Sequence, residues 1–315
     1  MLRMVFLTFD VEDFTNNHSV TALQSVLELL NKYDFKGIFF LTGHMAEKIQ
    51  DYPNVIELLE EHEIGYHSSS HSVHPTVFEF TDVENYDEAY RISLERETSH
   101  INPLSGEIEG LGGILFIKDL FPSKQIIAYR APGCCWSPPH TEALRDLGIK
   151  FDFSSNISQI PVYYNGLTFY PSPIFQAWNA DISNFRIFWI SAIKRQYIIM
   201  GFHPSLFVTY DGWDRIYHNG NPIFISSPAL REINEIKRLF YSFDLYLKHL
   251  KLLEKIGLIE VTTNVTESKI KLVATKNLIE KTYIHSIKWA KKTCNYKPKF
   301  LRLHFFRFFN FPVLG

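Results

Sequence analysis

Nearly continuous apolar runs alternate along the chain with amphipathic stretches. Residues 4–9 and 37–43 are almost wholly apolar, which is typical of buried parallel strands. Between them, apolar residues recur at the spacing of one helical face: Leu23, Val26, Leu27 and Leu30. Thr21 and Gln24 have the spacing of a capping box, which predicts that this helix begins near residue 21.

The same alternation continues through most of the chain. Further strands are predicted at 64–66, 126–132, 149–151, 197–204 and 258–263, and further helices at 54–65, 82–99, 138–148 and 228–256. Repeated strand–helix units favour a parallel α/β architecture, either a barrel or a doubly wound sheet. Residues 205–227 are aromatic and rich in turn formers, so we expect a long loop there beside the site.

Composition is compatible with one large α/β domain plus additions. The chain has 315 residues, is 46% hydrophobic and has a formal net charge of −2. No apolar run reaches the roughly 18 residues of a membrane-spanning helix, and the apolar start is too short for a signal peptide. Three cysteines, of which Cys134 and Cys135 are adjacent, do not form a disulfide framework. These features predict a cytoplasmic protein.

Charge is distributed unevenly. Residues 281–315 contain eight Lys or Arg and no Asp or Glu, so this segment carries a formal charge of +8. Since the whole chain carries −2, residues 1–280 carry −2 − 8 = −10. The segment 297–311 interleaves basic residues with phenylalanines. It either lies against the anionic inner face of a membrane or completes a core or dimer interface. No nucleic-acid partner is expected, because the body is acidic and no recognition motif is present.

Five of the apolar runs end in chemically reactive side chains. Because the C-terminal ends of parallel strands meet at one edge of a sheet or barrel, these side chains are expected to converge. They are Asp10 with Glu12, His67 with His71, Arg130, Asp152 and His203.

The pattern is compatible with a catalytic metal. The spacing His-x-x-x-His suits two metal ligands but is weak evidence alone. With one carboxylate from another strand, two imidazoles leave open positions on a divalent ion. Such an ion polarises a carbonyl and activates water, a second carboxylate takes a proton, and a separate histidine protonates a leaving group.

In order along the chain, "TFDVE", "HSSSH", "YRAP", "KFDFSS" and "GFHP" resemble the five motifs of NodB-type polysaccharide deacetylases, carbohydrate esterase family 4. The resemblance spans residues 4–263. It implies a distorted (β/α)7-type barrel over residues 1–263, followed by a helical, basic and aromatic extension, 264–315. It also implies metal-dependent removal of an N- or O-acetyl group from a sugar or polysaccharide precursor.

The resemblance implies that Glu12, His67 and His71 bind the metal. Zinc is expected first, with Co²⁺, Ni²⁺ or Fe²⁺ as alternatives. The first motif usually has adjacent aspartates, whereas this chain resembles a branch with one residue between its acids. Since side chains alternate along a strand, the gap lets Asp10 and Glu12 face the same way. Asp13 has no predicted role.

The remaining roles are also implied by the resemblance. Asp10 is the general base for a water held by the metal, and Arg130 orients Asp10. His203 is the general acid, oriented by Asp152, although Phe153 interrupts the usual fourth motif. Three residues are candidates for contact with the sugar, with core packing as the alternative for the two aromatic ones: Tyr129, Pro132 and Trp136.

Three rival functions remain open. The chain could deformylate or deacetylate a lipid-linked sugar, with its basic, Phe-rich tail at the membrane surface. It could hydrolyse a cyclic amide without a metal, although such relatives tend to lack the full metal triad. It could also be a catalytically inactive carbohydrate-binding protein. The sugar, the acyl group and the oligomeric state do not follow from the sequence, because specificity lies in loops such as 72–90, 104–125 and 205–227.

Overall fold

The structure of the chain is a computed structural model. It describes residues 2–71, 85–154, 160–171, 174–175, 195–213, 227–265, 272–273, 281 and 284. Most of the predicted extension 264–315, including the segment 297–311, lies outside these residues. The predictions of membrane contact and of a domain boundary at residue 263 therefore stay predictions.

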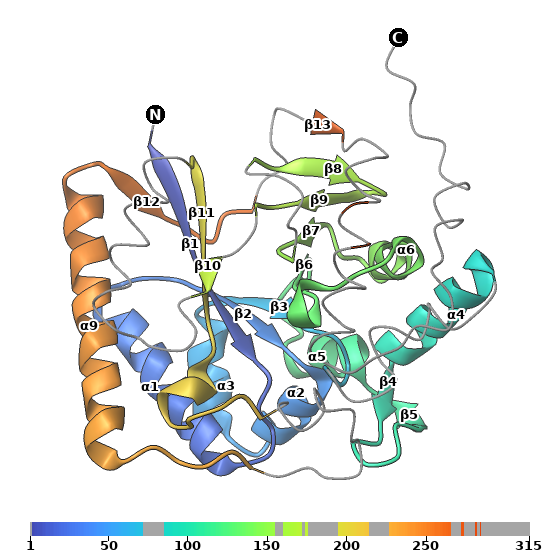
Figure 1. Cartoon of the computed structure of the whole chain (residues 1–315), viewed down its shortest axis with the longest axis horizontal. Helices are drawn as coiled ribbons and strands as arrows, with labels where there is room; N and C mark the ends of the chain where they lie inside the picture. The colour runs from blue at the N-terminus through green and yellow to red at the C-terminus, as the bar shows by residue number, and fades with distance from the viewer. Residues whose placement is uncertain are drawn as a thin grey trace.

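One large sheet organises the described part of the chain (Figure 1). Its strand order is β10-β11-β1-β2-β3-β6-β7-β9-β8-β13, and β12 also pairs with β1. All neighbouring pairs are parallel except β8 with β9. The strands are β1 (Arg3–Val11), β2 (Ile38–Leu41), β3 (Glu63–Tyr66), β6 (Ala128–Tyr129), β7 (Phe151–Asp152), β8 (Val162–Tyr164), β9 (Leu167–Phe169), β10 (Ile174–Phe175), β11 (Tyr197–Phe202), β12 (Ile259–Val261) and β13 (Leu272–Val273).

Helices follow most of the parallel strands. They are α1 (Asn17–Lys32), α2 (Gly43–Ile49), α3 (Pro53–Glu60), α4 (Tyr86–Glu97), α5 (Gly113–Leu120), α6 (Pro138–Asp146) and α9 (Ile233–Lys255), with 3-10 turns η2 (Pro132–Cys134) and η3 (Pro204–Phe207). A separate antiparallel pair is formed by β4 (Ser99–Ile101) and β5 (Ile108–Leu111).

Alternation along β1 separates two hydrophobic cores. Val5, Leu7 and Phe9 point into the larger core, called the outer core below, which lies between the sheet and helices such as α1 and α9. Phe6 points to the other side, into a smaller core, called the inner core below, which contains Phe40 of β2 and residues of β6, β7 and β11. The sheet therefore encloses side chains on its inner face and carries helices outside. This confirms the predicted distorted-barrel α/β fold.

The start of α1 differs from the prediction. Asn16 is the N-cap, and its side-chain oxygen accepts a hydrogen bond from the Ser19 backbone N–H at 3.0 Å. Thr21 lies inside the helix, so the predicted capping box is wrong. An asparagine directly before the helix, five residues earlier than Thr21, provides the same type of cap.

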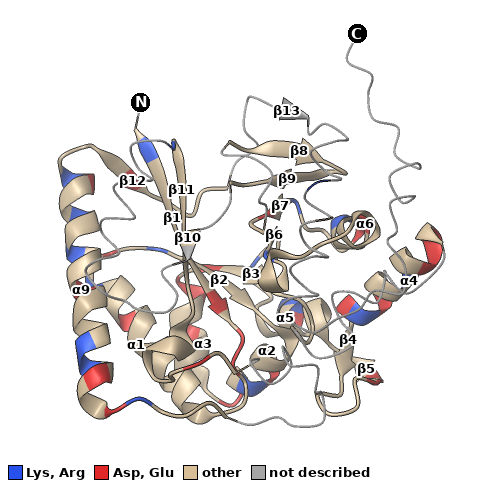
Figure 2. Cartoon of the chain, in the orientation of Figure 1, with Lys and Arg blue, Asp and Glu red and all other residues tan. Residues whose placement is uncertain are grey.

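The long helix α9 covers the core with one face, which includes Leu239, Phe243 and Leu250. Figure 2 shows that it carries both basic and acidic residues. Across the described residues, no helix combines the length and the apolar character needed to span a membrane.

Gly65 of β3 allows the inner core to close beneath the site. A Cβ atom at this position would lie 2.5 Å from Cδ1 of Phe40, which is closer than real Cβ contacts. The Phe40 ring in turn lies 4.6 Å below the guanidinium carbon of Arg130. The missing side chain therefore lets an aromatic ring support a residue of the predicted site.

We predict that Gly65→Ala lowers the free energy of unfolding by about 1–3 kcal/mol, because the added methyl group displaces Phe40. Urea unfolding monitored by circular dichroism measures this loss. In a Phe40→Val background the substitution should cost less, since the ring is gone. An equal cost in both backgrounds would contradict the steric explanation.

Candidate active site

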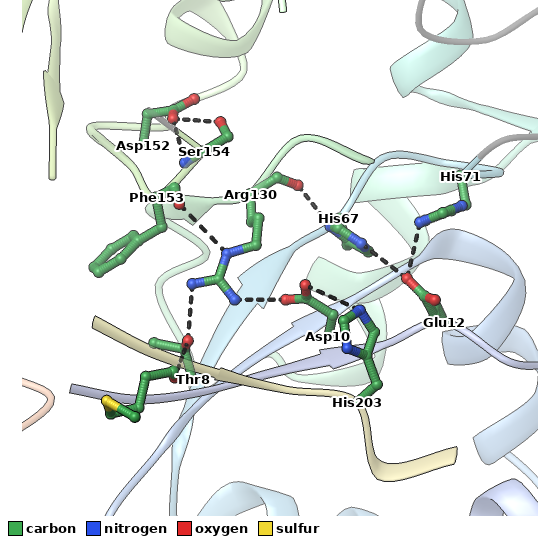
Figure 3. A network of polar contacts seen from close by, with 11 residues as sticks. Thr8, Asp10, Glu12, His67, His71, Arg130, Asp152, Phe153, Ser154 and His203 are labelled. Atoms are coloured by element: carbon green, nitrogen blue, oxygen red, sulfur yellow. Dashed lines mark hydrogen bonds and ion pairs between the residues drawn. The ribbon is translucent and has the colours of Figure 1, made fainter. Parts of the chain in front are cut away.

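The acids at the end of β1 lie on the inner side of the sheet. Thr8 and Asp10 alternate with the residues that enter the outer core, and Glu12 follows with the same parity. Asp10 is 2% exposed and Glu12 is 6% exposed. Figure 3 shows both carboxylates directed toward histidines from later strands. The one-residue gap therefore orients the two acids as expected, although each meets a different partner.

Glu12 lies between two imidazoles. Its Oε2 atom is 3.2 Å from His67 Nε2 and 2.8 Å from His71 Nε2. One ligand atom from each of the three residues lies within 4.8 Å of the others. The His67 Nδ1–H donates to the Arg130 carbonyl oxygen at 2.7 Å, which keeps the Nε2 lone pair directed at the cluster (Figure 3). These residues fit a divalent metal ion.

Electrostatics keep Glu12 ionised. Burial alone would raise its pKa, but His71 and His203 attract the carboxylate and His67 and His71 hydrogen-bond to it. The net effect holds the pKa of Glu12 well below its usual range. An ionised carboxylate beside two imidazole nitrogens is the donor set that Zn²⁺ and similar ions prefer.

The loop that carries the two histidines is tightly wound. Ser68 has φ 67° and His71 has φ 57°, so both lie in the left-handed region that non-glycine residues seldom adopt. The Ser68 hydroxyl accepts a hydrogen bond from the His71 backbone N–H at 2.9 Å. Two backbone N–H groups at the start of α2, those of Gly43 and His44, donate to the carbonyls of Ser68 and Ser69. The Ser68 hydroxyl and the backbone carbonyls of Ser68 and Ser69 thus hold the loop in its conformation.

Glu97 is a site residue that the sequence did not indicate. Its buried carboxylate accepts from the Ser69 backbone N–H at 3.0 Å and from the Tyr66 hydroxyl, and lies 2.7 Å from His140 Nε2. It therefore anchors the loop between His67 and His71. Glu97 ends a polar helix, α4, and nothing in its local sequence distinguishes it from a solvated acid.

Arg130 holds Asp10, the predicted general base. Its guanidinium is fully buried, and Nη1 donates to Asp10 Oδ1 at 2.7 Å while Nη2 donates to the Thr8 hydroxyl at 2.8 Å. With Oδ1 engaged, Asp10 Oδ2 faces His203, whose Nε2 lies 3.6 Å away (Figure 3). The structure thus brings Asp10, Arg130 and His203 together.

Asp152 is buried but takes different partners from those expected. One of its oxygens, Oδ1, accepts from the backbone N–H and the hydroxyl of Ser154. The other, Oδ2, is buried and has no hydrogen-bond partner among the described residues. Burial raises the pKa of Asp152 to about 6, against the opposing effect of Ser154. The described hydrogen bonds of Asp152 do not reach His203.

Two of the three candidate sugar contacts are core residues. Tyr129 and Trp136 are each 0% exposed and belong to the outer core, where Trp136 packs against Phe169. A side chain without exposed surface cannot stack on a sugar ring. Pro132 is also buried, at the start of η2. Core packing, which the sequence also allowed, describes the two aromatic residues better.

Asp13 has a structural role. Its two oxygens accept from the Thr15 backbone N–H and hydroxyl, from Asn16 Nδ2 and from the Ser19 hydroxyl, at 2.6–3.0 Å. It is 1% exposed and fixes the turn between β1 and α1. The third acid of the segment therefore belongs to the helix entry and not to the Glu12–His67–His71 cluster.

At the strand ends of the curved α/β sheet, two histidines and a carboxylate could hold a metal ion, and an arginine-held aspartate beside them could accept a proton. The family model described as polysaccharide deacetylase matches residues 2–113. These residues include the first two of the five motifs and all three proposed metal ligands. The predicted resemblance to polysaccharide deacetylases is thus confirmed over this part of the chain.

Solved structures with similar folds include several carbohydrate-active enzymes. A CE4 esterase from Streptococcus mutans is 14% identical with a TM-score of 0.44, over 82% of this chain and 85% of that one. A family 4 carbohydrate esterase from Bacillus anthracis is 17% identical with a TM-score of 0.38, over 82% and 80%. A 4-alpha-glucanotransferase from Thermococcus litoralis is 12% identical with a TM-score of 0.45, over 88% and 38%. Such low similarities transfer neither an activity nor a ligand. No curated protein matches the chain.

We predict that Asp152 makes stability depend on pH. In the folded protein it keeps its proton up to about pH 6, whereas in the unfolded chain it ionises near pH 4. Its stabilising contribution is therefore complete below about pH 4 and lost as the pH rises through about 6. Relative to Asp152→Asn, the free energy of unfolding of the unmodified protein should fall by up to about 3 kcal/mol across this window.

Urea unfolding of both proteins at pH 4, 5, 6 and 7, in the presence of a chelator, measures this difference. The comparison cancels the titration of all other groups. Parallel stability profiles would show that the Asp152 carboxyl does not resist ionisation.

Proposed function

We propose that the protein is a metal-dependent hydrolase that removes an N-acetyl or O-acetyl group from a sugar or polysaccharide precursor. The observation that carries the proposal is the Asp10–His203 pair, 3.6 Å apart, beside the Glu12–His67–His71 cluster. An acid–base pair next to a metal donor set is what acyl hydrolysis requires. The match to polysaccharide deacetylases supports an acetylated carbohydrate as the substrate class.

Glu12, His67 and His71 would hold the ion, with zinc as the first candidate and Co²⁺, Ni²⁺ or Fe²⁺ as alternatives. When bound, such an ion supplies Lewis acidity toward the acyl oxygen and lowers the pKa of a water molecule. The Arg130 carbonyl fixes the ring of His67, and the buried surroundings of the cluster strengthen electrostatic interactions within it.

Asp10 is the general base in this proposal. It takes a proton from water as the water oxygen bonds to the acyl carbon, and the resulting intermediate collapses with cleavage of the carbon–nitrogen or carbon–oxygen bond. Arg130 holds one oxygen of Asp10 and compensates its charge, which leaves Oδ2 available on the side of His203. The carboxylate therefore does not need to reorganise before it accepts the proton.

His203 donates a proton to the departing amine or alcohol, so that the products are acetate and the deacetylated sugar. Asp152 remains a positioning residue in the proposal. It shapes the Phe153–Ser154 segment through Ser154, and the Phe153 carbonyl accepts a long hydrogen bond from Arg130 Nε at 3.4 Å. It would act on the base through Arg130 and not by contact with the substrate.

We predict that substitutions distinguish the proposed base, Asp10, from the proposed metal ligands by their different effects on kcat and on metal content. Asp10→Asn should lower kcat for acetate release by about 10²- to 10⁴-fold while the bound metal is retained, because Asp10 lies outside the ligand cluster. Glu12→Ala or His71→Ala should lose both metal and activity. Acetate release from short N-acetylated sugar oligomers and metal analysis of the purified proteins measure the two properties.

Asp13→Asn is the matched control, because Asp13 is a neighbouring acid that serves the helix entry. It should lower stability but leave metal content and kcat unchanged. Full activity of Asp10→Asn would exclude the mechanism. Stoichiometric binding of the oligomers without acetate release, by metal-loaded protein, would instead favour the inactive carbohydrate-binding alternative.

A further inference from the structure

A second group of potential metal ligands lies outside the site described above. His44 and Glu47 lie three residues apart on α2, and His100 lies on β4. One ligand atom from each residue lies within 4.8 Å of the other two. The two imidazole rings are 5.6 Å apart, centre to centre. Neither the proposed mechanism nor the five sequence motifs use any of these residues.

His44 is arranged as metal-binding histidines usually are. Its Nε2–H donates to the Ile101 carbonyl oxygen at 2.6 Å, which assigns the proton to Nε2 and leaves a lone pair on Nδ1. Nδ1 is buried and has no hydrogen-bond partner in the part of the chain that the structure describes, and the residue as a whole is 5% exposed. A buried ring nitrogen without a partner is costly, and an ion would satisfy it.

Glu47 and His100 complete the group at a more accessible position. Glu47 Oε1 lies 2.7 Å from His100 Nδ1, and the side chains are 23% and 29% exposed. Glu109 of β5 approaches from solvent, with Oε2 3.9 Å from His100 Nε2. A hydrogen bond between Glu47 and His100 is enough to explain why these two side chains lie together. It does not satisfy the buried Nδ1 atom of His44, the third residue of the group.

We propose that His44, Glu47 and His100 bind a second divalent transition-metal ion. Two imidazoles and one carboxylate favour Zn²⁺, Ni²⁺ or Cu²⁺ over Mg²⁺ or Ca²⁺, which prefer oxygen ligands. The exposed side of the group admits the ion and leaves room for water as a further ligand. The site joins α2 to the β4–β5 hairpin, which the described structure otherwise links through hydrogen bonds and packing.

The proposed ion has a structural role next to the active site. The ring of Phe14 packs on His44 at 4.7 Å and on Trp213 at 5.0 Å, and Trp213 packs on His71 at 5.5 Å. The backbone N–H of His44 also donates to the Ser69 carbonyl in the loop between the two histidine ligands. An ion that restrains His44 would therefore also restrain the loop between His67 and His71 and the rings of Phe14 and Trp213 beside His71.

Metal stoichiometry of the full-length protein tests the proposal without any assay of activity. Protein loaded with Zn²⁺ and desalted should contain two ions per chain by elemental analysis. The double variant Glu47→Gln/His100→Ala should contain one, and so should His67→Ala/His71→Ala. Zn²⁺ should also raise the Tm of Glu47→Gln/His100→Ala less than that of the unmodified protein.

Glu47→Gln alone serves as a milder variant, since it preserves size and should weaken the second ion at least tenfold in equilibrium dialysis. His249→Ala, at an exposed histidine of α9 outside both clusters, should leave two ions bound. The proposal would be overturned if Glu47→Gln/His100→Ala and Glu47→Gln each bound as many ions as the unmodified protein, or if the unmodified protein bound one ion that only His67→Ala/His71→Ala lost. Because the readout is metal content, this result would leave the proposed hydrolase function standing.

Discussion

The arrangement of the site depends on one buried guanidinium. Arg130 has no exposed surface, so its charge must be compensated inside the protein, and the Asp10 carboxylate at 2.7 Å supplies the compensation. The Thr8 hydroxyl and the Phe40 ring occupy other sides of the same group. The backbone of Arg130 contributes as well, because its carbonyl orients His67. One residue therefore positions both the proposed base and a proposed ligand, and links β6 to β1, β2 and β3.

The loop from His67 to His71 shows how local strain is held in place. Two left-handed residues, Ser68 and His71, would be unfavourable in an isolated peptide. In the folded chain, the N-terminal turn of α2 binds two of the loop's carbonyls, and Glu97 binds the intervening N–H. These partners come from segments far apart in sequence. The loop therefore holds its histidines in a geometry that its own five residues could not maintain.

Four buried carboxylates divide their tasks according to their surroundings. Glu12 is held ionised by histidines, while burial favours the neutral form of Asp152. Asp10 is engaged by a guanidinium, and Asp13 accepts four hydrogen bonds at a helix entry. The repulsion expected from three acids at the end of β1 is therefore limited, because each carboxylate has its own positive or hydrogen-donating partners.

The sequence by itself determined the face on which Asp10 and Glu12 lie and the order of the main elements, which are strands β1, β2, β3, β6, β7, β11 and β12 and helices α1, α3, α4, α6 and α9. It did not indicate the shorter helices α2 and α5 or the strands β4, β5, β8, β9, β10 and β13. Periodicity and alternation are local properties, so they can be recognised in the sequence without knowledge of the fold. The sequence also indicated which strand ends carry reactive groups. Only the tertiary structure decided which groups meet. His203 faces Asp10, Asp152 accepts hydrogen bonds from Ser154, and Glu97 holds the loop between His67 and His71. Such contacts join segments far apart along the chain, and their geometry depends on how the sheet curves and how the cores pack.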